Sequence, residues 1–377
     1  MVRPPTVWVL LGKGMGGNGQ LTSLAEALGW PYEAKQLIYT RLSAVPNLLL
    51  GAAAIGIDRR RSSPLEPPWP QLVIAGSRRS APVARWIKKQ SGGATRLVHL
   101  MHAQAPLEHF DLIITTPQYR LPARPNVLHN TAPLNHVDPR RLAADAAHCA
   151  ERFAHLPRPY TVLLVGGNSS SFVLEPSVAA RLGREASAQV RATGGSLLLT
   201  TSARTPAASV DALLAAIDCP AFCHRWQLQD PQNPYHAFLA LADRFIVTVD
   251  SASLLAEACA MGKPVQIFQW PIRADARQGV KGLLRRWGET RDHQGNGAGH
   301  ASDWFYDRLV YWGLIKPARD FEAYTEALRA RGLVTIFGEA PAAQPLRPLD
   351  DMERALQRIR QLFAENGAAA SSIQWNT

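Results

Sequence analysis

Short runs of mainly apolar residues recur along the chain, and each leads into a small polar loop and then a segment with helical spacing. These runs cover residues 7–11, 72–75, 96–100, 112–115, 161–165, 195–200 and 245–249. Runs of this length, bounded by polar turns, are typical of strands buried on both faces of a sheet. Because predicted strands alternate with predicted helices, the pattern indicates an α/β protein with parallel, doubly wound sheets.

The clearest unit spans residues 245–268 and predicts a strand, a polar loop, a short helix and a second strand. The loop 250–253 supplies side chains that can cap the start of a helix, and Gly262 with Pro264 ends it. In such a βαβ unit, ligands bind beyond the carboxyl ends of the strands. Ser253 and Glu257 share one helix face there, which suits hydrogen bonds to ribose hydroxyls. An ordinary capped helix with a solvated glutamate is the alternative.

The first apolar run opens into a glycine-rich loop at residues 12–20, and residues 21–28 predict a helix. The loop contains the spacing GxGxxG, with Glu33 about 20 residues further on, which is the pattern of dinucleotide-binding proteins. It is longer and more polar than the tight turn of that pattern, so it can equally wrap an acceptor substrate. Under that interpretation the acceptor-side residues are Gly14, Gly16, Gly17, Asn18, Gln20, Ser77 and Arg78.

Three polar loops follow predicted strands in the second half, at residues 166–171, 201–205 and 250–253. The carboxyl ends of parallel strands face one way, so backbone N–H groups, hydroxyls and Arg204 can converge on one anion. Together with Glu257, the loops suggest a nucleoside diphosphate whose pyrophosphate lies over helix N-termini.

Two domains fit a chain of 377 residues that is 46% hydrophobic, because ~100–200 residues per domain is usual. The stretch Pro157-Arg158-Pro159 predicts the boundary between them. We therefore expect an N-terminal domain at 1–155, a C-terminal domain at 156–345, and a closing helix and tail at 346–377.

The formal net charge of +11 favours anionic partners such as nucleotides, phospholipid surfaces or nucleic acid. The charges are scattered along the chain, so a basic surface without a specific anionic partner is the alternative. No recognisable module interleaves basic residues with exposed aromatics, which argues against nucleic acid. The four cysteines lack the spacing of a zinc site and fit a reducing cytoplasm, so we expect no metal.

No run reaches the ~18 apolar residues needed to span a bilayer. Residues 48–57 are uncharged, and Asp58-Arg59-Arg60-Arg61 follows them. Two interpretations stay open: an apolar hairpin that dips into an anionic membrane surface, or a buried helix with a basic exit. The expected location is the cytoplasm, with peripheral contact at the inner membrane under the first interpretation.

Six motifs carry a resemblance to a known family. They are GKGMGGNGQ (12–20), AGSRRSAPVARWIKK (75–89), TPQYRLP (116–122), NVLHNTAPLN (126–135), LLVGGNSSSF (163–172) and VTVDSASLLAEACAMGKPV (247–265). From near the first residue to about residue 340, the chain resembles the mitochondrial-fission "elongated mitochondria" family of plants and its bacterial relatives. Its second half resembles the carboxy-terminal domain of GT-B glycosyltransferases. The resemblance implies a GT-B-like α/β fold, with two Rossmann-like domains whose parallel sheets face an interdomain cleft.

The resemblance also implies site residues. Donor phosphates would contact Gly167, Asn168, Ser169 and Ser170, supported by Ser202 and Arg204, with Ser251 and Ser253 at the distal phosphate and Glu257 on the ribose. The first domain would bind the acceptor and supply a base. The peptidoglycan enzyme of this fold has a histidine in its glycine-rich first loop, whereas this chain has none there. The nearby strand-end candidates for the base are His102, Asp111 and His129, and of these we take His102 and Asp111 as the predicted bases.

The function implied is metal-independent transfer of a sugar from a nucleoside-diphosphate sugar to a cell-envelope lipid or polysaccharide. No cofactor and no NAD are expected. A non-catalytic adaptor of the same fold, related to organelle-fission factors, is one alternative. A nucleoside-diphosphate-sugar epimerase is another, but none of the eight tyrosines has the lysine four residues later that short-chain dehydrogenases require.

Overall fold

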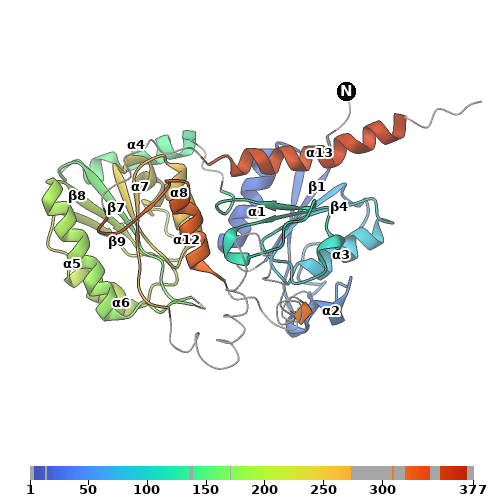
Figure 1. Cartoon of the computed structure of the whole chain (residues 1–377), viewed down its shortest axis with the longest axis horizontal. Coiled ribbons are helices and arrows are strands. Elements are labelled where there is room, and N and C mark those ends of the chain that lie inside the picture. Colours follow the sequence, from blue (N-terminus) through green and yellow to red (C-terminus); the bar gives the residue numbers. More distant parts are fainter. Residues whose placement is uncertain are drawn as a thin grey trace, which may run out of the picture. The chain divides into compact units, whose positions relative to one another are not determined.

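The computed structural model describes residues 4–12, 15–135, 139–169, 171–272, 308–309, 319–339 and 349–371, with the backbone alone at 15–16 and 365–371 (Figure 1). The chain forms two compact units. The first comprises residues 1–136, 284–320 and 350–377, and the second comprises 137–283 and 321–349. Each unit contains one six-stranded sheet in which the neighbouring strands are parallel.

The sheet of the first unit has the strand order β2-β1-β3-β4-β5-β6. Its strands are β1 (Val7–Leu11), β2 (Tyr32–Gln36), β3 (Leu72–Gly76), β4 (Arg96–Leu100), β5 (Leu112–Thr115) and β6 (Val127–His129). Among the described residues, the unit contains helices α1 (Met15–Leu28), α2 (Asn47–Leu50), α3 (Ala81–Gln90) and α13 (Asp351–Ser371). The strand order reverses between β1 and β3, which makes the carboxyl ends of these two strands a topological switch point.

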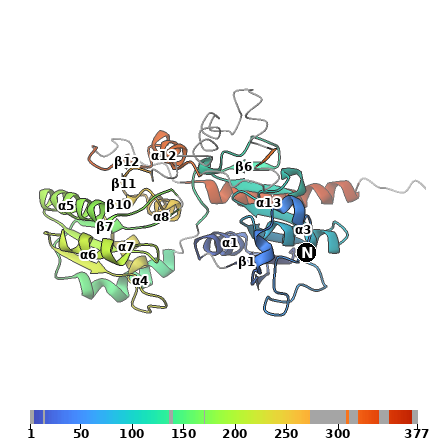
Figure 2. The same cartoon turned by 90° about the horizontal axis from the view of Figure 1, so that it is seen from below.

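Alternate residues of the strands fill two cores, one on each face of this sheet. Trp8 belongs to one core with Ile87 of α3, and Val9 belongs to the other with Leu24 of α1 and Ile359 of α13. Figure 2 shows α13 along the sheet of the first unit. The closing helix is therefore part of the first unit's core.

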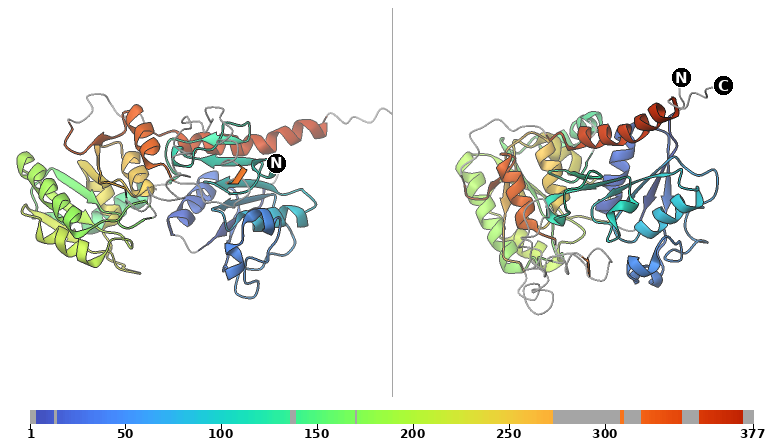
Figure 3. Two further views of the ribbon diagram at one scale, coloured as in Figure 1. Left: turned by 60° about the horizontal axis from the view of Figure 1, so that its bottom comes forward. Right: turned by 45° about the vertical axis from the view of Figure 1, so that its right-hand side comes forward.

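The sheet of the second unit has the strand order β12-β11-β10-β7-β8-β9. Its strands are β7 (Tyr160–Leu164), β8 (Ser196–Thr200), β9 (Ala221–His224), β10 (Arg244–Thr248), β11 (Val265–Phe268) and β12 (Thr335–Ile336). The described part of this unit contains helices α4 (Pro139–Phe153), α5 (Pro176–Thr193), α6 (Ala207–Ala215), α7 (Tyr235–Leu241), α8 (Ala252–Ala260) and α12 (Phe321–Ala330). Helix α5 packs against α6, and α4 against α7 (Figure 3). Here the order reverses between β7 and β10, as in dinucleotide-binding sheets.

The α/β class and the two parallel sheets predicted from the sequence are confirmed. Strands 7–11, 96–100 and 112–115 and the helix 176–193 have the predicted bounds. One prediction was wrong: α1 begins at Met15, not at residue 21, so most of the glycine-rich stretch is helical. Asn18 explains the early start, because its side chain accepts from Gly12 N (2.9 Å) and donates to Gly12 O (2.7 Å), holding the helix against the end of β1.

The division of the chain also differs from the boundary expected at 155/156. Helix α4 belongs to the second unit, where Phe153 is buried against Phe222 and Phe238 at ring distances of 4.9 and 5.4 Å. The closing helix belongs to the first unit, where Asp351 accepts hydrogen bonds from Thr131 N (2.9 Å) and Ala132 N (2.8 Å). Both differences follow from packing between residues far apart in the sequence.

The uncharged segment 48–57 is neither a regular hairpin nor a buried helix. Its only helical part is the end of the four-residue α2. Leu48, Leu49 and Ile55 are 46, 73 and 59% exposed, while Leu50 and Ile57 are buried. Among the described residues, none of the helices is long and apolar enough to cross a membrane.

Candidate functional site

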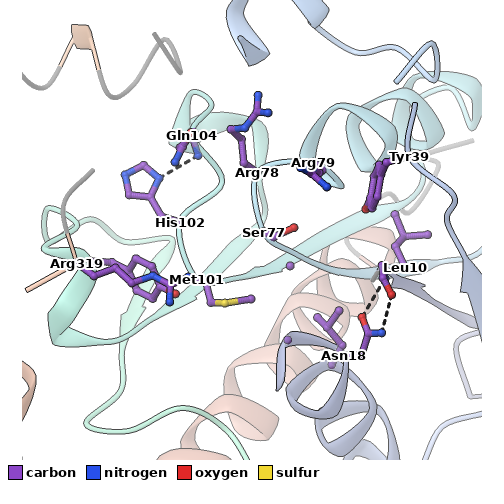
Figure 4. Close-up of a pocket in the computed structure, with 15 residues that line it drawn as sticks. Leu10, Asn18, Tyr39, Ser77, Arg78, Arg79, Met101, His102, Gln104 and Arg319 are labelled. Carbon is purple, nitrogen blue, oxygen red and sulfur yellow. Dashed lines mark hydrogen bonds between the residues drawn. The ribbon is translucent and has the colours of Figure 1, made fainter. Parts of the chain in front are cut away.

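A pocket of about 480 Å³ opens at the switch point of the first unit (Figure 4). Gly12 follows β1, Ser77 follows β3, and Met101 and His102 follow β4, so the pocket lies at the carboxyl ends of three neighbouring strands. In an open parallel sheet this edge is the expected place for a ligand.

Four of the predicted acceptor-side residues line this pocket: Gly17, Asn18, Ser77 and Arg78. Gly16 and Gln20 belong to α1. Gly14 lies outside the described residues. The structure thus brings together loops that the sequence analysis had grouped only by their type.

The described lining of the pocket includes three arginines and no carboxylate. Arg78 is committed to the loop beside it, since it donates to Val45 O (2.8 Å) and Ser43 O (2.5 Å). Burial, and then the charge of Arg79, lower the pKa of Arg78. Arg79 and Arg319 are exposed and pair with no carboxylate among the described residues. The pocket therefore carries uncompensated positive charge.

Both unpaired guanidinium groups lie over aromatic rings. Arg79 is 5.8 Å from the ring centre of Tyr39, and Arg319 is 5.7 Å from that of Tyr119. Such stacking holds the planar guanidinium while leaving its N–H groups available. Burial raises the pKa of Tyr39 to about 12, so this tyrosine is neutral and does not cancel the charge of Arg79.

Three residues that line the pocket have left-handed backbone conformations although they are not glycine. Their φ values are 73° at Ser77, 68° at Met101 and 49° at Gln104. Such conformations cost of the order of 1–3 kcal/mol each and concentrate at functional sites. The surrounding structure supports them: Met101 N donates to Ile114 O at 2.8 Å, and the Ser77 carbonyl bonds to His99 Nε2 at 3.1 Å.

His102, one of the two predicted bases, lines the pocket and is 8% exposed. Gln104 N donates to its Nδ1 at 2.9 Å, so in the neutral ring the proton is on Nε2. Burial, and then the charge of the neighbouring His99, lower the pKa of His102 to about 3. The ring consequently offers an N–H donor, which does not suit the role of a base.

Asp111, the other predicted base, precedes β5 and so lies at the amino edge of the sheet. It forms ion pairs with Lys88 (2.7 Å) and Arg96 (3.1 Å) and accepts from Leu97 N (2.7 Å). These contacts join α3, β4 and β5. We therefore assign Asp111 a structural role, on the edge of the sheet opposite the pocket.

In the second unit, the three predicted polar loops meet at the switch point between β7 and β10. Gly166 N donates to Thr248 Oγ1 (2.7 Å), Gly167 N to Asp250 Oδ2 (2.9 Å), and Asn168 N to the carbonyl of Arg204 (2.9 Å). The loops at 166–171 and 201–205 approach so closely that glycine is required, because a Cβ on Gly167 would lie 2.1 Å from the Arg204 carbonyl oxygen.

Asp250 is the centre of this cluster. Contrary to the prediction for loop 250–253, its side chain does not cap helix α8. Ser251 is the N-cap of α8, and no side chain caps the helix there. Asp250 is buried and pairs with Arg204 Nη1 at 2.9 Å. Burial raises the pKa of Asp250, while the charge of Arg204 opposes the shift. The first N–H groups of α8 therefore lack a side-chain acceptor at this edge.

The other predicted donor residues lie around the same edge. Asn168 Oδ1 accepts from Leu174 N (3.0 Å), and Ser169 Oγ from Phe172 N (3.1 Å), so both side chains shape their loop. Ser202 donates to Gly166 O at 2.7 Å. Ser253 is in the first turn of α8, and Ser170 lies outside the described residues.

Glu257 is held by a partner that sequence reasoning missed. The Tyr235 hydroxyl, at the start of α7, donates to Glu257 Oε2. Burial raises the pKa of Glu257, and the hydrogen bond from Tyr235 opposes that shift. The carboxylate is thus oriented, with acceptor capacity left for another hydroxyl.

A small pocket of about 100 Å³ lies beyond the ends of β10 and β11. Its lining is mainly apolar and includes Val249, Phe172 and Trp270. The ring centres of Phe172 and Trp270 are 5.5 Å apart. Trp270 is fixed by a hydrogen bond from Nε1 to Val173 O at 3.0 Å. A flat apolar group fits such a lining.

Sequence reasoning also missed several residues of the first pocket. Arg79 adjoins the predicted Arg78 in the AGSRRS motif, so the signal for it was present. Tyr39 and Arg319 have no comparable signal, because they enter the pocket from segments distant in sequence.

These features define an α/β protein with two parallel sheets, each with a polar site at its topological switch point. The chain belongs to the Mitochondrial fission ELM1 family, whose profile matches residues 15–311, as its motifs indicated. It is 26% identical over 344 residues to Mitochondrial fission protein ELM1 of Arabidopsis thaliana, covering 85% of this chain and 70% of that protein. It is 24% identical over 298 residues to Uncharacterized protein RP120 of Rickettsia prowazekii (strain Madrid E), covering 70% and 83%.

Solved structures are similar at a lower level. MurG of Acinetobacter baumannii aligns with a TM-score of 0.40 at 14% identity, covering 95% of this chain and all of that chain (100%). A glycosyltransferase of Rickettsia africae ESF-5 aligns with a TM-score of 0.45 at 11% identity, covering 96% and 99%. Similarity at this level carries no conclusion about activity.

Proposed function

We propose that this protein is a glycosyltransferase that moves a sugar from a nucleoside-diphosphate sugar to a cell-envelope acceptor. The observation that carries the proposal is the polar site at each switch point. One site has a half-buried, oriented carboxylate on a helix whose N-terminus is uncapped, and the other is a cationic pocket. The first suits a nucleotide and the second an anionic substrate.

The donor is assigned to the second unit. The uncapped N–H groups of α8 and Arg204 would receive the diphosphate, so no metal is required to stabilise the leaving group. Glu257 would accept hydrogen bonds from ribose hydroxyls, with Tyr235 holding its other oxygen in place. The apolar pocket beside Phe172 and Trp270 would take the base.

The acceptor is assigned to the first unit's pocket. In the transfer, an acceptor oxygen forms a bond to C1 of the sugar, and the bond from C1 to the diphosphate oxygen breaks with its electron pair. The proton of the acceptor must pass to a base. His102 and Asp111 do not suit that role, and we assign the base to no residue.

The first unit also supports the predicted contact with an anionic membrane. Leu42, Leu48, Leu49 and Ile55 are exposed, and they share a segment with the exposed Arg41 and Arg59–Arg61. We call residues 41–61 the apolar-basic segment. Apolar side chains surrounded by arginines match a surface of anionic lipid, where the chains insert and the charges pair with headgroups.

Thermal unfolding of the purified protein against UDP, GDP, CMP, TDP, ADP and NAD tests the donor assignment. One nucleoside diphosphate should raise the melting temperature by several degrees, because saturation at 100 times Kd adds about 2.7 kcal/mol. Glu257→Gln should weaken that binding by about tenfold or more. Glu326→Gln, an exposed glutamate of α12, is the matched control.

Each outcome separates the candidate functions. A response to one nucleoside diphosphate that Glu257→Gln weakens, followed by release of sugar from the corresponding nucleotide sugar, supports the transferase. A response to NAD alone supports the epimerase. The absence of a response to any nucleotide would contradict a donor site. It would favour the alternative of a non-catalytic adaptor related to organelle-fission factors.

A further inference from the structure

We propose that the pocket of the first unit binds a phosphate group carried by the acceptor, and that His102 donates a hydrogen bond to that group instead of acting as a base. This inference rests on the proposed function, since it names the substrate class of the acceptor site. It makes the acceptor a phosphomonoester or a diphosphate.

The charge of the pocket matches a phosphate better than a carboxylate. Arg79 and Arg319 bring two positive charges, and the described lining brings no negative one. A carboxylate would neutralise one of the two, whereas a phosphate dianion neutralises both. Guanidinium forks also fit phosphate oxygens in bidentate pairs. The aromatic rings beneath both guanidinium groups reduce the entropy that each side chain loses on binding.

The first turn of α1 adds to this attraction. Gly17 and Asn18 line the pocket, and they lie in the first turn of a 14-residue helix. Unpaired N–H groups and the helix dipole favour an anion at this end. The Asn18 side chain is occupied by Gly12, so the backbone of the turn is what faces the ligand.

His102 is suited to donate because its tautomer is set by the backbone. The Gln104 N–H occupies Nδ1, and Gln104 itself has a left-handed backbone conformation. The neutral ring must then carry its proton on Nε2, which is left to donate. An unprotonated phosphate oxygen is an acceptor only, so it pairs with this nitrogen without a proton transfer.

Binding of inorganic phosphate and pyrophosphate to the nucleotide-free protein, measured by calorimetry, is the test. We expect binding that weakens about tenfold or more in Arg79→Gln and in Arg319→Gln, because each loses a charge-assisted bond. Lys89→Gln removes the same charge from an exposed position of α3 outside the pocket and should bind as wild type does.

His102→Asn separates the donor role from a structural one. Asparagine Oδ1 can still accept from Gln104 N, while the donor at Nε2 is lost. We expect weaker phosphate binding with little change in the melting temperature. Nitrogen NMR of the wild type should show the proton on Nε2 at pH 7, with and without phosphate. A proton on Nδ1, or unaltered phosphate binding in His102→Asn, would contradict the donor role.

The source of the phosphate is decided by two further probes. A short, water-soluble isoprenyl phosphate tests a free phosphomonoester, and vesicles containing phosphatidic acid test a lipid headgroup. If Arg79→Gln weakens binding of one of these probes, the pocket binds the phosphate of that source. Failure of both phosphate ions and both probes to bind overturns the proposal. Because no nucleotide is present, this failure is distinct from failure of the donor assignment.

Discussion

At the residue scale, Gly167 is a position where the second unit leaves no room for a side chain. An added Cβ would lie 2.1 Å from the Arg204 carbonyl, a backbone atom that cannot move alone. We expect Gly167→Ala to lower the free energy of unfolding of this unit by about 1–3 kcal/mol, as overpacking does. Urea unfolding measures the change.

Gly19→Ala is the control for that substitution. Gly19 is exposed in α1 with no atom within 4 Å of the added Cβ, so alanine should raise stability by about 0.5–1 kcal/mol. Equal effects of the two substitutions would show that the loop at Gly167 can shift, which would contradict the need for glycine at this position.

The buried histidines predict how stability depends on pH. Burial lowers the pKa of His102 to about 3 and of His99 to about 4, below the value of about 6.5 in the unfolded chain. Between these values the unfolded state binds more protons. The free energy of unfolding that His99 and His102 contribute is therefore fully present above pH 6.5 and is lost as the pH falls toward 4 and 3.

We expect each histidine to remove up to about 1.4 kcal/mol per pH unit between pH 6 and pH 4. Burial raises the pKa of Asp250 and Glu257, which acts in the opposite sense, so wild type must be compared with His102→Asn. Chemical denaturation at several pH values should give a shallower slope for the variant. Parallel slopes would mean that His102 is protonated in the folded protein.

At the element scale, the apolar-basic segment is tied directly to the pocket. Arg78 donates to the carbonyls of Ser43 and Val45, and Asn47 Nδ2 donates to Arg78 O and Ala103 O, each at 2.9 Å. A membrane-bound segment would thus hold the pocket wall at the lipid surface. This geometry suits an acceptor that is itself a lipid.

We expect Leu49→Ser with Ile55→Ser to weaken binding to anionic vesicles by about tenfold or more, because burying one such side chain is worth about 1.5–3 kcal/mol. Cosedimentation with vesicles measures this. Leu228→Ser is the control, since Leu228 is as exposed as Leu49, at 73%, but lies in the second unit. Equal loss in the control, or no loss in the double variant, would exclude the segment as the docking surface.

At the scale of the whole molecule, the two switch points assign two ligands to two units. Hydrogen exchange should therefore separate them. A nucleoside diphosphate should slow exchange in residues 201–205 and 250–257, and phosphate should slow it in residues 76–79 and 101–104. Phosphate protection should disappear in Arg79→Gln. Protection of one and the same unit by both ligands would contradict the assignment.

The sequence alone determined the fold class, most strands and helices, the family and the loops that carry polar side chains. These properties are local, because hydrophobic period and turn residues act within a few positions. The central strands are buried on both faces, so their apolar runs were easy to recognise: Leu163, Leu198 and Ile246 have no exposed surface (0%). The start of α1 was not predicted correctly because glycines locally disfavour helices. The hydrogen bonds of the Asn18 side chain to Gly12 outweigh that preference.

The tertiary structure alone decided which strands are neighbours, and hence where the switch points lie. It brought Arg319 beside Tyr119, paired Arg204 with Asp250 and placed Tyr235 on Glu257. It also set the tautomer of His102 and moved Asp111 to the opposite edge of the sheet. Each of these depends on contacts between distant residues, and such contacts determine charge pairing and proton position while leaving no periodic trace in the sequence.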